Sequence, residues 1–589
     1  MAFLLASFGE IADREWASAV TELGSGLASA TFQWRDAGAA VSLAVAGAPG
    51  ALARPSTDGL ACIVAGEGAD HPQSQRPERV MTTYRAHGAD GFGQIDGEYA
   101  FVLWDPQRRK LFVGCDALGL RGLAYRHSGK AFVASSRAVA LLRIGDEVQR
   151  WDRTYLAHGL SGVWDRDASA TAFLGISRLL GGRVLEVSAR GIRHASADGL
   201  CFGRFEGHRS LTPEAVLREK LTKAVKQRLD APRACIAWSG GIDSSAVAAS
   251  LTRLASADAF TVISSHADPA SGLAIKRLAA RFPRLSVRAV DLSAAATAHE
   301  SSPTADDPIC SGPAYQVARL ALWRAIREAG WRRFFDGEGG DEVFDIAWRP
   351  ADLASPSAAI AVLRTLQWRA LRPVVRDLVQ RYGRGPVSRW WMSRRIAAMR
   401  RARPWLRHSF WSSQAWQEAW QETVAFRRRR CARKRLAEIV AVHGRYWRAQ
   451  SLIRLSMGLE AISPLLDRSV VEFVGSLPAR IAMDPRLGKA ILRRMVEPSL
   501  GEAAWLPKRE PLHAWLVGRV AKDPEALRMT LERLRATPTL REVIDIERVM
   551  QTASAIRADP ATPPAAYSLA ELFALVEWAA HIEGQYGVH

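Results

Sequence analysis

A glycine turn between a predicted strand and a predicted helix is the part of the sequence that most directly indicates chemistry. The apolar run 234–238 leads into Ser239-Gly240-Gly241-Ile242-Asp243-Ser244-Ser245, and the helical stretch 246–251 follows. Successive backbone N–H groups and the helix dipole then converge on one point, which favours phosphate. Glycines let the backbone approach closely, the Ser hydroxyls add donors, and Asp243 can hold Mg²⁺ against phosphate oxygens. The turn therefore predicts a phosphate site made by Ser239, Gly240, Gly241, Asp243, Ser244 and Ser245.

A second group of polar residues follows the apolar pair Phe334-Phe335. The stretch 336–342, Asp-Gly-Glu-Gly-Gly-Asp-Glu, places four acidic residues around three glycines. Such a stretch makes a poor core and fits a second Mg²⁺ anchor at the end of a parallel strand, where α/β sheets place their ligands. An exposed acidic loop is the alternative reading.

Two patterns of periodicity divide the chain. Residues 1–207 alternate apolar segments with Gly, Asp and Pro turns, as in 99–104, 110–114 and 130–134, which predicts a strand-rich domain. From about Pro213 helical periodicity dominates, with short buried strands at 234–238, 260–263 and 333–335. This alternation predicts a parallel sheet covered by helices on both faces over residues 208–589. A length of 589 residues agrees with two domains.

Cysteine usage and hydropathy bear on the compartment. The six cysteines are far apart and form no C-x-x-C pair, so reduced core thiols are expected rather than disulfides or a zinc site. The apolar start Ala2–Phe8 has no basic leader and is expected to be a strand, not a signal peptide. No stretch reaches the roughly 18 uninterrupted apolar residues of a spanning helix. We expect a cytoplasmic protein with no membrane partner.

The net charge of +20 is concentrated between Leu363 and Arg448, where tryptophans are interleaved with arginines. One reading is a set of amphipathic helices whose tryptophans pack inward while solvated arginines face out. The other reading is a docking surface for a peptide, a protein or a nucleic acid. The sequence leaves both open.

The two acidic and glycine-containing stretches resemble a known family. The turn at 239–245 is not the G-x-x-x-x-G-K-[ST] loop, so transfer of a γ-phosphate is not implied. It resembles the S-G-G-x-D-S signature of ATP pyrophosphatases, and 337–342 resembles the G-E-G-S-D-E segment of asparagine synthetases, with Gly340 in place of the serine. The resemblance implies ATP and Mg²⁺ as cofactors, with Asp243 and Asp341 holding the metal on the pyrophosphate. It also places Gly337 at the nucleotide and Glu338 near the reacting carboxylate or amine.

Four later stretches extend the resemblance. Residues 459–467 and 470–478 are similar to the family's E-x-R-x-P-x-L-D and V-E-F segments, with Ile462 in place of the arginine and Glu460 at the acidic position. Residues 488–494 and 506–510 are similar to its K-x-x-L-R and R-x-K-E stretches. This order makes Lys508 the candidate catalytic lysine, because a cation there would stabilise charge on the α-phosphate.

The front domain resembles the glutaminase half of asparagine synthetases through 96–101 and 114–120. The resemblance implies a four-layer N-terminal-nucleophile α+β fold, followed by an ATP-pyrophosphatase domain with a parallel sheet flanked by helices. In that family a cysteine after the initiator methionine attacks glutamine. Here Ala2 stands at that position, and Ala65 replaces the family's asparagine in the N-G-E stretch. We therefore expect a degenerate glutaminase-like domain and an amine from another source.

An amine already present in the substrate is the simplest source, as in β-lactam synthetases and lasso peptide macrolactam synthetases. The acid at Glu338 counts against the first branch, which has a tyrosine there. The basic segment could dock a ribosomal precursor or core peptide, and the helical tail at 569–578 is similar to that of lasso cyclases. We expect ring closure between the peptide's α-amine and an Asp or Glu side chain, with Glu338 or Glu460 taking the ammonium proton. Whether a leader peptidase is a further partner stays open.

Two rivals remain. An ammonia-dependent asparagine synthetase would need only aspartate and ammonia. A tRNA-thiolating ATP pyrophosphatase would suit the positive charge, but such enzymes commonly carry the C-x-x-C pairs that this chain lacks. A nucleic-acid partner is therefore not expected.

Overall fold

The computed structural model of the chain describes most of its length. The described residues are 2–25, 31–47, 52–53, 56–67, 76–128, 131–145, 148–162, 168–195, 199–203, 205, 211–264, 271–292, 313–346, 386–427, 432–482, 487–505, 511–559 and 564–589. Among the helices within these ranges, none combines the length and hydropathy needed to cross a bilayer.

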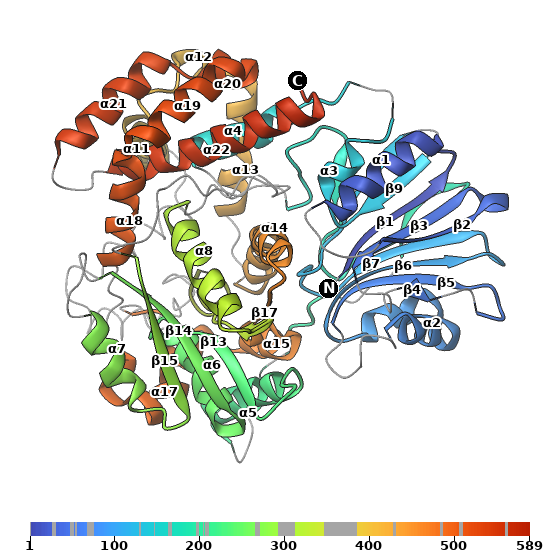
Figure 1. Cartoon of the computed structure of the whole chain (residues 1–589), viewed down its shortest axis with the longest axis horizontal. Helices are drawn as coiled ribbons and strands as arrows, with labels where there is room; N and C mark the ends of the chain where they lie inside the picture. Colours follow the sequence, from blue (N-terminus) through green and yellow to red (C-terminus); the bar gives the residue numbers. More distant parts are fainter. Residues whose placement is uncertain are drawn as a thin grey trace.

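Two antiparallel sheets form the N-terminal domain, called the front domain, at the right of Figure 1. In the described residues the first has the order β10-β8-β9-β1-β3-β2 and the second the order β12-β11-β7-β6-β5-β4. The first consists of β10 (Ile176–Arg178), β8 (Ala124–Ser128), β9 (Ala131–Ser135), β1 (Ala2–Gly9), β3 (Val41–Gly47) and β2 (Thr31–Asp36). The second consists of β12 (Gly191–Ala195), β11 (Val184–Ser188), β7 (Lys110–Cys115), β6 (Glu98–Asp105), β5 (Ala61–Glu67) and β4 (Leu52–Ala53).

Alternation along the strands explains why the two sheets stack. Leu4 and Ala6 of β1 pack in the core between the sheets, whereas Phe3 and Leu5 pack on the opposite face. Successive strand residues point to opposite faces, so a strand with apolar residues at every position is buried on both sides. Helices α1 (Asp13–Gly24) and α3 (Ala138–Leu141) cover the first sheet, and α2 (Arg76–His87) covers the second. The predicted four-layer arrangement is confirmed.

A parallel sheet forms the centre of the rest of the chain, below α8 and α14 in Figure 1. Its order is β15-β14-β13-β16-β17, and every neighbouring pair is parallel. The strands are β15 (Leu285–Asp291), β14 (Ser256–Ile263), β13 (Arg233–Ala237), β16 (Arg333–Phe335) and β17 (Glu460–Ile462). The predicted parallel sheet flanked by helices is confirmed.

Helices cover both faces of this sheet. Ile236 of β13 packs in the core that contains α5 (Pro213–Lys226), α6 (Ile242–Leu254), α15 (Arg468–Ser476) and α17 (Ala490–Leu500). Cys235, the preceding residue, packs in the core that contains α8 (Pro313–Glu328) and the end of α14 (Ala432–Ser456). Because parallel strands are buried on both faces, their sequences read as short continuous apolar runs.

A helical layer joins the two domains at the top of Figure 1. One apolar core contains residues of the front domain, such as Trp151 and Phe173, together with Trp578 of the C-terminal helix. The layer consists of α4 (Arg153–Ser161), α11 (Pro386–Ala402), α12 (His408–Ser412), α13 (Gln414–Arg427), α18 (Pro511–Lys522), α19 (Pro524–Ala536), α20 (Pro538–Val543), α21 (Ile546–Ala558) and α22 (Pro564–Tyr586).

The basic, tryptophan-rich segment contributes to this packing. Four of its tryptophans are buried: Trp405, Trp411, Trp416 and Trp447. The inward packing of tryptophans is therefore confirmed for these four, while residues 363–385, with Trp368, lie outside the described residues. The arginines differ from the expectation of a solvated face, because Arg435 and Arg448 are buried and Arg403 Nη2 pairs with Glu571 Oε2 at 2.8 Å.

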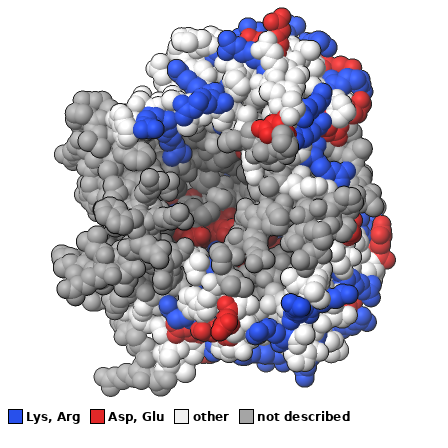
Figure 2. All heavy atoms as spheres, turned by 90° about the vertical axis from the view of Figure 1, so that its left-hand side faces the viewer, with Lys and Arg blue, Asp and Glu red and all other residues white. Residues whose placement is uncertain are grey.

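In Figure 2 acidic side chains lie inside a hollow, with Lys and Arg side chains on the surface above and below it.

Candidate active site

The predicted phosphate turn connects β13 to α6 at the carboxyl edge of the parallel sheet. Gly240 has φ of +72°, a left-handed conformation that favours glycine. Ser244 Oγ accepts a hydrogen bond from Ser239 N at 3.2 Å, and Ser239 Oγ accepts one from Gly241 N at 3.3 Å. Ser245 is fully buried, and its Oγ accepts a bond from Trp238 Nε1 at 3.1 Å. Ser245 thus anchors the helix start, while the hydroxyls of Ser239 and Ser244 accept from backbone N–H groups within the turn and fix its shape.

The second predicted stretch lies against this turn. It follows β16 directly, and its glycines make the close approach possible. A Cβ atom at Gly337 would lie 2.6 Å from Ser244 N, and one at Gly340 would lie 2.1 Å from Asp243 Cγ. Both distances are shorter than any real Cβ contact, so side chains at these two positions would push the two loops apart.

The two predicted metal ligands lie close to each other, and a lysine lies between them. Lys489 Nζ is 2.6 Å from Asp243 Oδ2 and 2.5 Å from Asp341 Oδ1. Lys489 comes immediately before α17 with φ of +51°, and Gly488 before it has φ of +65°. This left-handed pair turns the chain so that the lysine side chain reaches the carboxylates, with only 10 % of that side chain exposed.

Burial and mutual repulsion shape the electrostatics of this group. Burial raises the pKa of Asp243 to about 6; the Lys489 ammonium opposes the rise and the Asp341 carboxylate adds to it. Burial tends to lower the pKa of Lys489, but the two carboxylates outweigh it and raise that pKa. The site therefore favours a bound cation strongly.

The chemistry of these donors fits Mg²⁺. Mg²⁺ is usually bound through one or two carboxylates plus substrate phosphates rather than by an all-protein cage. Asp243 and Asp341 supply that pair beside a phosphate turn, and the Lys489 ammonium stands where a cation belongs. Among the described residues no group of three or more His, Cys, Asp or Glu forms a complete metal cage, as expected for a metal that shares its ligands with a nucleotide.

The other predicted acids line a pocket between the two domains. Glu338 and Glu460 contribute from the domain with the parallel sheet, and Glu98 and Arg121 contribute from the front domain. Glu460 Oε1 accepts from Arg121 Nη2 at 2.7 Å, and Glu338 Oε1 lies 3.3 Å from Arg319 Nη2. Glu460 is more deeply buried, with 7 % of its side chain exposed against 26 % for Glu338.

Asp336 lies next to Glu338, and its pKa is strongly raised. Burial, followed by the nearby Glu338 carboxylate, raises the pKa of Asp336 to about 7. The carboxyl accepts a hydrogen bond from Ser463 Oγ at 2.7 Å and one from Glu338 N at 3.2 Å. Close to neutral pH this group can therefore hold or release a proton beside Glu338.

Two residues of the candidate site were not predicted from the sequence. Lys508, the predicted lysine, lies outside the described residues, and Lys489 is the cation that the structure places at the acidic pair. The G-K-A-I-L-R stretch at 488–493 was the available signal, because it matched the family's K-x-x-L-R segment. Arg121 was also missed, since no local pattern connects it with Glu460.

The two positions at which the resembled glutaminases carry their catalytic cysteine and asparagine are occupied by alanines. Ala2 begins β1, and Ala65 is a buried residue of β5. Burial raises the pKa of the Cys62 thiol and of the Cys115 thiol well above the usual range. A thiol that resists ionisation is a poor nucleophile, so neither cysteine of these sheets is suited to attack an amide.

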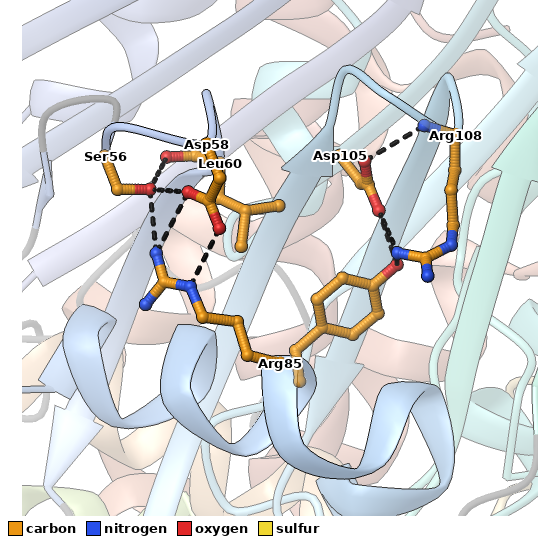
Figure 3. Close-up of polar contacts among 7 residues, drawn as sticks. Ser56, Asp58, Leu60, Arg85, Asp105 and Arg108 are labelled. Atoms are coloured by element: carbon orange, nitrogen blue, oxygen red, sulfur yellow. Dashed lines mark hydrogen bonds and ion pairs between the residues drawn. The ribbon is translucent and has the colours of Figure 1, made fainter.

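A polar cluster on the outer side of the front domain is structural (Figure 3). Arg85 of α2 donates from Nε to Asp58 Oδ2 at 2.8 Å, which, with Ser56, keeps the pKa of Asp58 well below its usual range. Beside it, the Tyr84 hydroxyl donates to Asp105 at 2.7 Å. Carboxylates that are held in the charged form by such partners do not act as bases near neutral pH.

Comparisons with known proteins agree with this geometry. Residues 216–579 match the family model "Asparagine synthase", and residues 68–196 match "Glutamine amidotransferase domain". The chain is 28% identical to "Amidase chry2" of Gibberella zeae over 49% of this chain and 46% of that protein. It is 29% identical to "Asparagine synthetase [glutamine-hydrolyzing] 3" of Bacillus subtilis over 33% of this chain and 32% of that protein. The chain thus spans less than half the length of these curated relatives.

One solved structure aligns with part of the chain. The glutamine phosphoribosylpyrophosphate amidotransferase of B. subtilis, complexed with ADP and GMP, aligns with a TM-score of 0.24 and 13% identity. The alignment covers 43% of this chain and 64% of that one. The family model, which matches more than half of the chain, and the site geometry lead to one conclusion: the chain belongs to the asparagine synthase family, with an amidotransferase-like domain in front.

Proposed function

We propose that the protein is an ATP-dependent carboxylate–amine ligase that forms AMP. The observation that carries the proposal is the position of Asp341 beside Asp243 of the turn at 239–245. The two carboxylates lie on either side of one cation, the Lys489 ammonium. A phosphate turn beside a metal-binding carboxylate pair suits the pyrophosphate part of ATP. The family assignment and the names of the relatives support amide chemistry.

The residues divide the work as follows. The backbone of Ser239–Ser245 binds and orients the phosphates, and Asp243 with Asp341 would hold Mg²⁺, which supplies charge neutralisation on the pyrophosphate. A carboxylate oxygen of the substrate attacks the α-phosphorus, the bond to the β-phosphate oxygen breaks, and pyrophosphate leaves. Lys489 is placed to stabilise the negative charge that builds up on these oxygens.

The second step forms the amide. An amine nitrogen attacks the acyl carbon of the adenylate, the bond to AMP breaks, and the nitrogen loses a proton. Glu338 is better placed than Glu460 to accept that proton, because its contact with Arg319 is longer (3.3 Å) than the contact of Glu460 with Arg121 (2.7 Å), and because Glu338 is more exposed. Asp336, with a pKa of about 7, can pass the proton onward.

The finer proposal is macrolactam ring closure of a lasso peptide, between its N-terminal amine and an Asp or Glu side chain. The buried, un-ionised Cys62 and Cys115 support an amine that does not come from glutamine. Holding both reacting groups in one folded peptide would make the second step effectively unimolecular. The second candidate, amide formation on a small molecule with ammonia, is favoured by the relative named as an asparagine synthetase.

Mass spectrometry after incubation with ATP, Mg²⁺ and the peptide encoded beside the gene tests the proposal. Loss of one water from the peptide, together with AMP formation, is the expected result, and Asp243→Asn should abolish both. A parallel incubation with aspartate and ammonia distinguishes the second candidate. Turnover of those two compounds without water loss from any peptide would reject ring closure and retain the amide ligase.

A further inference from the structure

Lys489 forms short ion pairs with both of the carboxylates that are predicted to hold the metal. Its Nζ lies 2.8 and 2.6 Å from the two oxygens of Asp243 and 2.5 Å from Asp341 Oδ1. Charge-assisted bonds of this length to a buried ammonium are strong. The single positive charge of the lysine thus offsets one of the two carboxylate charges that would attract a divalent cation.

Gly340 provides the space for this arrangement. A Cβ atom at this position would lie 2.1 Å from Asp243 Cγ and 2.4 Å from its Oδ1. The Asp243 carboxylate therefore occupies the volume in which a side chain at 340 would begin. The asparagine synthetase segment that this stretch resembles has a serine at this place, so the glycine is a specific departure that lets Asp243 reach Lys489.

We propose that Lys489 is an internal counter-ion that competes with Mg²⁺ for Asp243 and Asp341, and that it leaves them only when ATP supplies phosphate oxygens in exchange. The inference rests on the proposed function for the identity of the nucleotide. An ammonium and a divalent cation cannot share the same carboxylate oxygens at these distances, because their repulsion in a buried site is large. Binding of the metal therefore requires Lys489 to move.

This exchange couples the metal to the nucleotide. When ATP is absent, release of Lys489 would leave a buried ammonium without a partner, which opposes metal binding. When ATP is present, the ammonium can pair with a phosphate oxygen while Mg²⁺ takes the carboxylates. By thermodynamic linkage, the nucleotide then raises the metal affinity and the metal raises the nucleotide affinity by the same factor.

Titration of the full-length protein with Mn²⁺, followed by electron paramagnetic resonance of the free ion, tests the proposal without any turnover. In the absence of nucleotide, Lys489→Met should bind Mn²⁺ at least about tenfold more tightly than the wild type. A non-hydrolysable α,β-methylene analogue of ATP should raise the affinity of the wild type and have a smaller effect on the variant. Equal Mn²⁺ affinity of wild type and Lys489→Met without nucleotide would overturn the proposal.

Two further variants keep the result interpretable. Lys489→Gln retains a hydrogen-bond donor for the carboxylates and should show the same gain in affinity if Lys489→Met does not fold. Arg494→Met removes a cation from the same helix, where Arg494 Nε pairs with Glu214 at 2.5 Å, away from the acidic pair. It should leave Mn²⁺ affinity at the wild-type value, and a gain there would also overturn the proposal. Because the readout is metal binding, failure of the amide-forming activity alone would leave this result unaffected.

Discussion

Arg121 of the front domain and Glu460 of the synthetase sheet form a buried ion pair, with 2.7 Å between Nη2 and Oε1. The two residues are 339 positions apart in the chain. The turn that carries Arg121 is held by the Asp116 carboxylate, which accepts bonds from the backbone N–H groups of Leu118, Leu120 and Arg121 at 3.0 to 3.1 Å. The front domain is therefore a wall of the synthetase pocket.

Removal of Arg121 should destabilise the protein through the charge that it leaves behind. We expect Arg121→Met to cost about 3 to 5 kcal/mol, because the buried Glu460 carboxylate loses the cation that lies closest to it among its ion pairs with Arg121 and Arg333. In the double variant Arg121→Met/Glu460→Gln the loss should be smaller than the sum of the two single losses by at least about 1 kcal/mol. Urea unfolding followed by tryptophan fluorescence measures all three.

A control for this cycle is available on the surface. Arg528 pairs with Glu525 and Glu532 on the exposed face of α19, and Arg528→Met should leave the unfolding midpoint unchanged. Strictly additive losses in the Arg121 and Glu460 variants would show that the pair does not couple the two domains.

How far the sequence predicts this site depends on the distance over which each feature is encoded. The turn at 239–245 is local, since a strand, two glycines and a helix start in order are enough to indicate it. Apolar segments separated by turns likewise predict the strand-rich front domain, and short apolar runs between helical stretches predict the parallel sheet. Lys489 depends on two successive left-handed residues, Gly488 and Lys489, which periodicity does not reveal. Arg121 meets Glu460 only through the packing of two domains, and no pattern within a single sequence encodes such a contact.

Gly337 should be required for the nucleotide site rather than for the fold. A Cβ atom there would lie 2.6 Å from Ser244 N and 2.9 Å from Asp243 C, and backbone atoms cannot move aside as a flexible side chain can. We expect Gly337→Ala to weaken ATP binding at least about tenfold, as measured by calorimetric titration.

A matched glycine provides the control for this substitution. Gly584 in α22 has no atom within 4 Å of the position that its Cβ would take, so Gly584→Ala should bind ATP like the wild type. Wild-type ATP affinity in Gly337→Ala would show that the two loops do not form one binding site.

Asp336 should give the protein a distinctive dependence of stability on pH. Burial raises its folded pKa to about 7, above the unfolded value near 4, so the folded state holds the proton more tightly between these two values. The contribution of Asp336 to stability is therefore complete at low pH and is lost as pH rises towards the folded pKa. Asp336→Asn keeps an acceptor for Ser463 and removes the titration.

We therefore expect the stability difference between Asp336→Asn and the wild type to shift in favour of the variant as pH increases from 5 to 8. Urea midpoints of both proteins across this range measure the shift. A difference that stays constant with pH would mean that Asp336 titrates at its ordinary value, and that it is not available to relay a proton from Glu338.

Tyr84 should matter for stability and not for the reaction, because it lies on α2, the helix that covers the second sheet of the front domain. Its hydroxyl donates to the buried Asp105 carboxylate at 2.7 Å, and Arg108 is the other hydrogen-bond partner of this carboxylate within the described residues. Tyr84→Phe should cost about 1 to 3 kcal/mol in urea unfolding, since a buried carboxylate loses a donor. Release of pyrophosphate from ATP should stay at the wild-type rate at temperatures where the variant is folded.

Tyr125 of β8 offers the matching control, because its ring stacks on Phe132 and its hydroxyl makes no hydrogen bond within the described residues. Tyr125→Phe removes the same atom and should change stability much less than Tyr84→Phe. Equal losses in the two variants would mean that the Tyr84–Asp105 bond adds nothing beyond the ring itself. A loss of pyrophosphate release in folded Tyr84→Phe would instead show that the Tyr84 cluster is energetically coupled to the nucleotide site. The coupling would run through the sheet that carries Glu98, because Glu98 and Glu460 line the same pocket.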